Sequence, residues 1–179
     1  MTEAWKGVEG LKPRFIKIGV NRGPLDPLDR KIVRAAALCA KETGLTIQSH
    51  TGNGVAAMEQ IGIVTREKVE PSKFVWVHAD GEKDHDFHEK AGRAGAWVQF
   101  DHVSQQGLAW HIECVRFMEG KGMLNRTLIS QDAGYYKPGE PGGGAFRPYS
   151  SISKYFLPAV PPLWGLQLLI VNPVQAYGK

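Results

Sequence analysis

Short apolar runs alternate along the chain with longer segments in which apolar side chains recur every three or four residues. The short runs are rich in β-branched and aromatic residues and are nearly continuous, as in strands buried on both faces of a sheet. They comprise residues 14–20, 45–50, 72–80, 96–104 and 126–134. The segments between them, which predict helices, comprise residues 26–44, 52–69, 82–95 and 108–122. Five strands alternating with helices predict an α/β fold with a parallel sheet of crossover units.

Turn and capping residues mark the boundaries of these elements. Asp26 suits the N-cap of the first helix, Pro27 its first turn and Gly44 its end. Gly62 is a candidate interruption of the second helix. A loop rich in glycine and proline follows the last strand, and the tail then predicts two helices separated by the pair Pro161–Pro162.

Composition limits the classes of protein to which the chain can belong. The 179 residues suffice for a single domain, residues 1–179, and 42% of them are hydrophobic and 22% charged. The net charge of +4 comes without a run of five basic residues or an aromatic-rich basic strand, so a nucleic-acid partner is not expected. No apolar run approaches the roughly 18 residues of a membrane span, and the start, MTEAWKGVEG, lacks the regions of a signal peptide. We therefore expect a globular, cytoplasmic protein without a membrane partner, and the two cysteines do not suggest a disulfide framework.

Polar residues interrupt the apolar runs mostly where the predicted strands end. In parallel α/β folds these carboxyl ends meet at one edge, where ligands bind. The residues are Lys17, which lies slightly deeper in its strand, His50, His78, Asp101, His102 and Asp132. Each alone has a structural explanation: a lysine whose amine reaches solvent, a hydrogen-bonded histidine at the edge of the core, or a turn aspartate. Together, on five successive strands, they predict a ligand site.

Five of these strand motifs carry a family resemblance. FIKIGV, IQSHTG, WVHAD, FDHVS and ISQDAG, in this order and spacing, resemble the phosphotriesterase family of the amidohydrolase superfamily. NP followed by QAYG, between residues 172 and 178, is similar to that family's closing helix. The resemblance implies a (β/α)8 TIM-type barrel with two divalent metal ions at its carboxyl face. It also implies a hydrolase of small-molecule phosphotriesters, lactones or related esters.

The resemblance implies a role for each matching residue. Lys17 would carry carbon dioxide as a carbamate that bridges the two metal ions, which would be zinc or, alternatively, manganese or cobalt. His50 and His78 would bind one metal ion, and Asp132 would bind the other. A desolvated lysine suits this chemistry, because burial favours the neutral amine that reacts with carbon dioxide. The carbamate also removes the cost of a buried positive charge.

The same resemblance implies a path for protons. A hydroxide held between the metal ions would attack the substrate, while Asp132 orients it and accepts its proton. His102 would pass the proton outward to a carboxylate. The family places that carboxylate just after the histidine that ends the preceding strand. This position falls on Gly81 here, with Asp80 and Glu82 on either side.

The sequence departs from the family pattern at both ends. The family's first strand carries a His-x-His pair for the more buried metal ion, and no such pair occurs in this sequence. The first strand here corresponds to the family's fourth, so the chain predicts a partial barrel whose N-terminal strands are missing. The short, apolar segment PPLWGLQ replaces a longer connection and predicts a displaced closing helix.

Two classes of function therefore stay open. The first is a binuclear metal hydrolase that is complete only with the missing strands. The second is a catalytically inactive half-barrel fragment or an assembly partner. A single metal ion held by Lys17, His50 and His78 is a further alternative. An open sheet exposes unpaired edges and an apolar face, so a second copy of this chain is a candidate partner and a homo-oligomer a candidate state.

Overall fold

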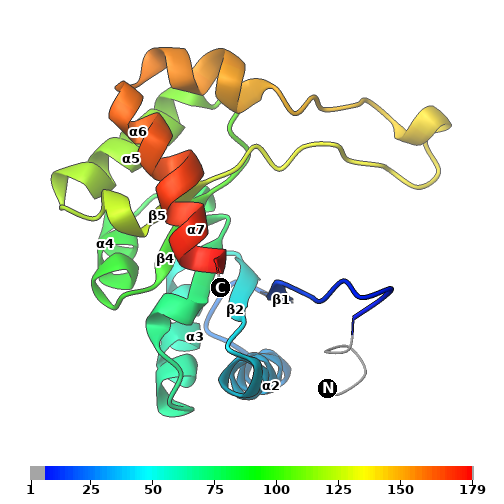
Figure 1. The fold of residues 1–179 in the computed structure, drawn as a ribbon, viewed down its shortest axis with the longest axis vertical. Helices are drawn as coiled ribbons and strands as arrows, with labels where there is room; N and C mark the ends of the chain where they lie inside the picture. The colour runs from blue at the N-terminus through cyan, green and yellow to red at the C-terminus, as the bar shows by residue number, and fades with distance from the viewer. Residues whose placement is uncertain (1–6, 179) are drawn as a thin grey trace.

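The computed structural model describes residues 7–178 and contains a parallel sheet of five strands (Figure 1). The strands follow one another across the sheet in the order of the sequence. They are β1 (Phe15–Val20), β2 (Thr46–Thr51), β3 (Phe74–Val77), β4 (Trp97–Phe100) and β5 (Thr127–Ile129). Each neighbouring pair is parallel. The predicted α/β alternation and the parallel sheet are thus confirmed, while part of the start MTEAWKGVEG lies outside the described residues.

Four helices connect the strands and were predicted at nearly these positions. They are α2 (Pro27–Thr43), α3 (Gly54–Arg66), α4 (His85–Arg93) and α5 (Leu108–Gly120). The Asp26 side chain accepts a hydrogen bond from the Asp29 amide at 2.8 Å, and Gly44 ends α2 with a left-handed φ of 70°. The expected interruption at Gly62 is wrong, because α3 continues through it. Burial of its flanking residues Ile61 and Ile63 offsets the low helix propensity of one glycine.

The two faces of the sheet have different neighbours. Strand residues that point toward the helices, such as Ile47, Trp76 and Phe100, belong to the main core. The residues that alternate with them form a smaller cluster on the opposite, inner face. This inner cluster contains Val75, Val77, Trp97 and Leu128, and Ala176 and Tyr177 from the end of the chain pack against it. The inner face is therefore covered only in part by the chain's own residues.

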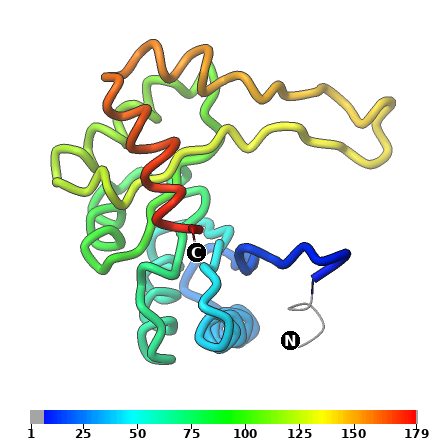
Figure 2. The backbone as a smooth tube through the Cα atoms, viewed as in Figure 1, coloured from blue at the N-terminus to red at the C-terminus, as the bar shows by residue number. Residues whose placement is uncertain are grey.

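The end of the chain folds back across the sheet. A long arm, residues 131–151, leaves the carboxyl end of β5 and projects from the body before the chain returns (Figure 2). Helical turns at Ile152–Phe156 and Leu157–Ala159 follow, and then α6 (Pro162–Leu166), a π-helical turn (Gln167–Val171) and α7 (Asn172–Tyr177). The predicted break between the two tail helices is confirmed.

Buried polar contacts anchor α7 to the starts of two strands. The Asn172 side-chain amide donates to the Leu124 carbonyl at 2.8 Å and to the Thr127 carbonyl at 2.6 Å. The Thr46 hydroxyl donates to the Ala176 carbonyl at 2.6 Å. The tail helix is therefore fixed at the amino end of the sheet, opposite the edge where the polar strand ends meet.

Large apolar side chains remain exposed on the outer side of this tail helix. They form what we call the apolar stripe: Leu163, Leu166, Ile170 and Val174, each between 51% and 64% exposed. The residues that alternate with them around the helix, Trp164, Leu168 and Ala176, are buried. Among the described strands, β1 and β5 lie at the two ends of the sheet, and each pairs with one neighbour. Within residues 7–178, no helix has the length and apolar character needed to cross a membrane.

Candidate functional site

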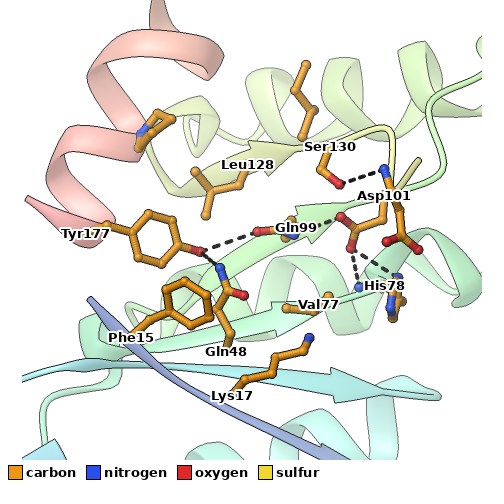
Figure 3. A pocket seen from close by; sticks show the side chains of 13 residues that line it. Phe15, Lys17, Gln48, Val77, His78, Gln99, Asp101, Leu128, Ser130 and Tyr177 are labelled. Atoms are coloured by element: carbon orange, nitrogen blue, oxygen red, sulfur yellow. Dashed lines mark hydrogen bonds and ion pairs between the residues drawn. The ribbon is translucent and has the colours of Figure 1, made fainter. Parts of the chain in front are cut away.

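A cavity of about 480 Å³ lies on the inner face of the sheet (Figure 3). Lys17, His78, Asp101 and Asp132 line its polar end, toward the carboxyl ends of the strands. Apolar and aromatic residues, including Tyr177, line the rest. Side chains from all five strands and from α7 therefore line one cavity, at the edge of the sheet where the sequence predicts a ligand site.

Lys17 projects from the middle of β1 into this cavity (Figure 3). Burial lowers the pKa of its amine, and the charges of Asp101 and Asp132 act in the opposite direction. The neutral amine is thus more accessible than on an exposed lysine. Lys17 is the lysine expected from the sequence to face the site, and it does so.

His50 and His78 lie side by side at the ends of β2 and β3. Their ring centroids are 4.4 Å apart in an edge-to-face arrangement. Burial, together with the nearby charges of His78 and Lys17, lowers the pKa of His50. A neutral imidazole is the form that binds a metal ion, so this environment favours the ligand form of His50.

Asp101 fixes the position of His78. The backbone amide of His78 donates to Asp101 Oδ2 at 2.7 Å, and its Nδ1 lies 3.2 Å from the same oxygen. The second contact raises the pKa of His78 although its alignment falls short of a hydrogen bond, and His78 Nδ1 is a buried atom without a hydrogen-bond partner. Burial alone would raise the pKa of Asp101, but hydrogen bonds from His78, Ser130 and Gln99 outweigh it, and the pKa is lowered.

His102 bridges two carboxylates. Its Nε2 lies 3.0 Å from Asp132 Oδ2, and its Nδ1 lies 3.2 Å from Asp80 Oδ2. Of the residues around the position expected for the outer carboxylate, Asp80 makes this contact. Glu82 instead accepts a hydrogen bond from the amide of Gly54 at 2.9 Å, at the start of α3. The structure therefore distinguishes two carboxylates that the sequence left equivalent.

Donor atoms suited to a divalent metal ion gather at this edge. One ligand atom each from His78, Asp80 and His102 lies within 4.8 Å of the others. Imidazole nitrogen and carboxylate oxygen are ligands that zinc accepts, and His78 Nδ1 makes no hydrogen bond, although it lies 3.2 Å from Asp101 Oδ2. The chemistry of the donors therefore fits a metal ion. Asp80 was not among the metal ligands expected from the sequence, whereas His50, Lys17 and Asp132 were.

Two further residues at this edge escaped the sequence interpretation. Asp101 was predicted only to be a polar residue at the end of a strand. Its contact with His78 depends on the directions in which the consecutive residues Asp101 and His102 point, which the sequence does not give. Tyr135 begins the arm, and its hydroxyl donates to Asp132 Oδ2 at 2.5 Å. The signal for Asp101 was its place directly before His102 at the end of an apolar strand. The signal for Tyr135 was its place at the start of the glycine- and proline-rich loop, residues 135–147, which was expected to line the pocket, although no role was assigned to the tyrosine itself.

The sequence pattern of the phosphotriesterase family matches residues 2–166. The chain belongs to this family. It is 31% identical over 136 residues to the phosphotriesterase homology protein of Escherichia coli, covering 73% of this chain and 47% of that protein. It is 29% identical over 99 residues to an aryldialkylphosphatase of Saccharolobus solfataricus, which is 54% of this chain and 32% of the relative.

Solved structures show the same relationship. A variant of the organophosphorus hydrolase of Deinococcus radiodurans superposes with a TM-score of 0.84 at 26% identity, over 99% of this chain and 60% of that one. The five strands and their helices thus form part of a TIM-type barrel, as expected. The chain spans about half the length of the Escherichia coli relative.

Proposed function

We propose that this chain is the carboxyl-terminal part of a metal-dependent hydrolase that cleaves phosphotriesters, lactones or related esters of small molecules. The observation that carries the proposal is the cavity that Lys17, His78 and Asp132 line together, with His50 beside His78. The names of two relatives, aryldialkylphosphatase and organophosphorus hydrolase, support the reaction class.

Each residue has a defined task in this proposal. Lys17, once carboxylated, presents two oxygens in place of an ammonium, and His50 and His78 present imidazole nitrogens to a metal ion. Bound divalent metal ions, zinc or alternatively manganese or cobalt, would activate water as a nucleophile and polarise the P=O or C=O bond of the substrate. Asp132 presents a carboxylate between the metal side of the cavity and His102.

Proton transfer follows the contacts of His102. Asp132 Oδ2 lies 3.0 Å from one ring nitrogen, and Asp80 Oδ2 lies 3.2 Å from the other. A proton taken up by Asp132 during attack on the substrate therefore has a path of hydrogen-bond length to Asp80. Because Asp101 donates its own amide to Asp80 Oδ1 at 2.8 Å, the outer carboxylate is held in place.

The second candidate function is that of a catalytically inactive half-barrel or an assembly partner. The free edges of β1 and β5 and the apolar stripe favour it. In the first candidate, further strands that carry the missing pair of histidines would complete the barrel. They differ in whether the completed barrel turns over an ester.

Metal analysis of the purified chain tests the site. We expect fewer than two tightly bound zinc ions per chain, and weaker binding in His50→Ala and His78→Ala. His85→Ala is the matched control, because His85 lies on α4 and not at the cavity. His111 would be a poorer control, since its ring contacts the carbonyl of Asp101. Equal effects of all three substitutions would contradict the assignment of His50 and His78.

Activity of the completed barrel separates the two candidate functions. The chain would be joined to, or coexpressed with, the complementary amino-terminal part of a family member that carries the His-x-His pair. Metal-dependent hydrolysis of an aryl ester, lactone or phosphotriester, lost by at least about 100-fold in Asp132→Ala, supports the hydrolase. A folded, metal-loaded barrel without turnover of any of these substrates supports the inactive partner.

A further inference from the structure

The arm that follows β5 is tied to the candidate site through one hydroxyl. Tyr135 stands at the beginning of the arm and donates to Asp132 Oδ2 at 2.5 Å. The same oxygen lies 3.0 Å from His102 Nε2. Both of these contacts of the Asp132 carboxylate fall on Oδ2, so neither of them engages Oδ1.

The two limbs of the arm contact each other at its base, next to this hydrogen bond. The Gly134 amide donates to the Arg147 carbonyl at 3.0 Å, which ties the outgoing limb to the returning one. The Arg147 guanidinium lies 5.9 Å from the centre of the Tyr135 ring. Gly134, with a φ of 76°, leaves room for the Tyr149 hydroxyl, which would lie 1.7 Å from a Cβ at this position. Tyr135 is thus held between the aspartate on one side and the returning limb on the other.

A second set of contacts joins the same limb to the strand end. Gln131 donates through its side-chain amide to the Tyr149 carbonyl, and its side-chain oxygen accepts from the Ile152 amide at 3.1 Å. The Ser130 hydroxyl accepts from the Asp132 amide at 3.1 Å. These bonds hold the backbone before Asp132, and the bond of the Gly134 amide holds the backbone after it, so the orientation of the carboxylate depends on His102 and Tyr135.

We infer that Tyr135 is a positioning residue: it holds Oδ2 of Asp132 so that Oδ1 faces the metal side of the cavity, and it couples the arm to that aspartate. The inference rests on the proposed metal role of Asp132. Partners of metal-binding carboxylates act in this way, because they fix the orientation of the ligand before the ion arrives. The arm is then part of the site and not a free loop.

Two measurements on the whole chain test this role, with Tyr135→Phe as the variant. Tyr136→Phe is the matched control, because Tyr136 is the next residue, is 74% exposed and is not at the cavity. In a titration with cobalt(II) followed by its visible absorption, we expect Tyr135→Phe to weaken binding by about 10-fold and to change the absorption spectrum. Tyr136→Phe should match the unmodified chain in both respects.

The second measurement uses metal-free protein and is independent of the proposed function. Hydrogen exchange of the Gly134 and Lys137 amides, which close the arm, should quicken by about 5-fold in Tyr135→Phe. Asp132→Ala should have a similar effect, and the double variant should add nothing further, since both remove one bond. Additive effects, or exchange equal to that of Tyr136→Phe, would overturn the inference. If the chain binds no cobalt while exchange behaves as expected, the metal role of Asp132 fails and the coupling of the arm to Asp132 stands.

Discussion

Asp101 holds His78 through both its backbone and its ring, with Oδ2 2.7 Å from the amide nitrogen and 3.2 Å from Nδ1. The carboxylate is 1% exposed, so neither contact competes with solvent. His78 adopts a left-handed φ of 67°, a conformation that is uncommon for a residue other than glycine. A residue that was not expected to be a ligand thus determines where an expected ligand points.

Asp101→Ala should lower the free energy of unfolding by about 2–3 kcal/mol, because the buried amide of His78 loses its charged acceptor. Urea unfolding followed by circular dichroism measures this change. Glu42→Ala is the control, since Glu42 lies exposed on α2 and its loss should change stability by less than about 0.5 kcal/mol. Equal stability of the two variants would show that the bond between His78 and Asp101 is not formed in solution.

Protonation of His88 should destabilise the fold in mild acid. His88 is fully buried, and burial lowers its pKa from 6.5 to about 4. The unfolded chain therefore binds a proton that the folded chain does not between these two values. The contribution of His88 is fully present above pH 6.5 and is lost as the pH falls toward 4, by up to about 3 kcal/mol.

A comparison of the unmodified chain with His88→Gln isolates this contribution. Unfolding free energies at pH 7 and pH 4.5 give the loss for each protein, and the loss should be smaller in His88→Gln. The difference between the two losses is the relevant quantity, because other groups, such as His50, titrate in both proteins. Identical losses would place His88 in an environment that admits its charged form.

The sequence was sufficient for the sheet because its signals were local. Each strand is an apolar run bounded by turn residues, and each helix has an apolar period and, in α2, recognisable caps. The break predicted at Gly62 was wrong because the low helix propensity of glycine was considered without the burial of its neighbours, which is known only from the packed structure. The tail helix was predicted, while its anchoring through Asn172 depends on carbonyls 45 and 48 positions away.

The candidate site was predictable only in part. Lys17, His50 and His78 were recognised because a polar residue in or at the end of a buried strand is unfavourable unless it has a partner or a ligand. The sequence did not distinguish Asp80 from Glu82, because the direction of each side chain depends on the turn after β3. His78, His102 and Asp132 adopt positive φ angles, which affect the direction of their side chains. Because such angles are uncommon in residues other than glycine, the sequence does not indicate them. Tyr135 could not be found because its contact depends on the path of the arm.

The apolar stripe should make the isolated chain associate with itself. Leu166 and Ile170 are 51% and 58% exposed, and neighbouring apolar residues extend the surface along the helix. The double substitution of Leu166→Lys with Ile170→Lys should reduce self-association, because burial of two ammonium groups in an interface is unfavourable. Light scattering across a concentration series measures this effect.

Stability provides the control for the stripe. The double variant should unfold at the same denaturant concentration as the unmodified monomer, since both side chains already face solvent. Leu168→Lys, on the buried side of the same helix and 1% exposed, should instead destabilise the fold by at least about 2 kcal/mol. A double variant that associates as before would place the contact between copies elsewhere, for example at the edge of β1.

Metal uptake should depend on carbon dioxide through Lys17. Burial lowers the pKa of its amine, so a neutral fraction is available to form the carbamate. Zinc binding by the chain should therefore strengthen when bicarbonate is added, and Lys17→Ala should lose both part of the affinity and the response to bicarbonate. A small carboxylic acid such as propionate should partly restore binding in Lys17→Ala, because it can supply the missing oxygens in the space left by the side chain.

Lys73→Ala, which removes a lysine outside the cavity, should respond to bicarbonate as the unmodified chain does. A Lys17→Ala variant with unchanged affinity and unchanged bicarbonate response would show that metal binding in this chain relies on the histidines and carboxylates alone.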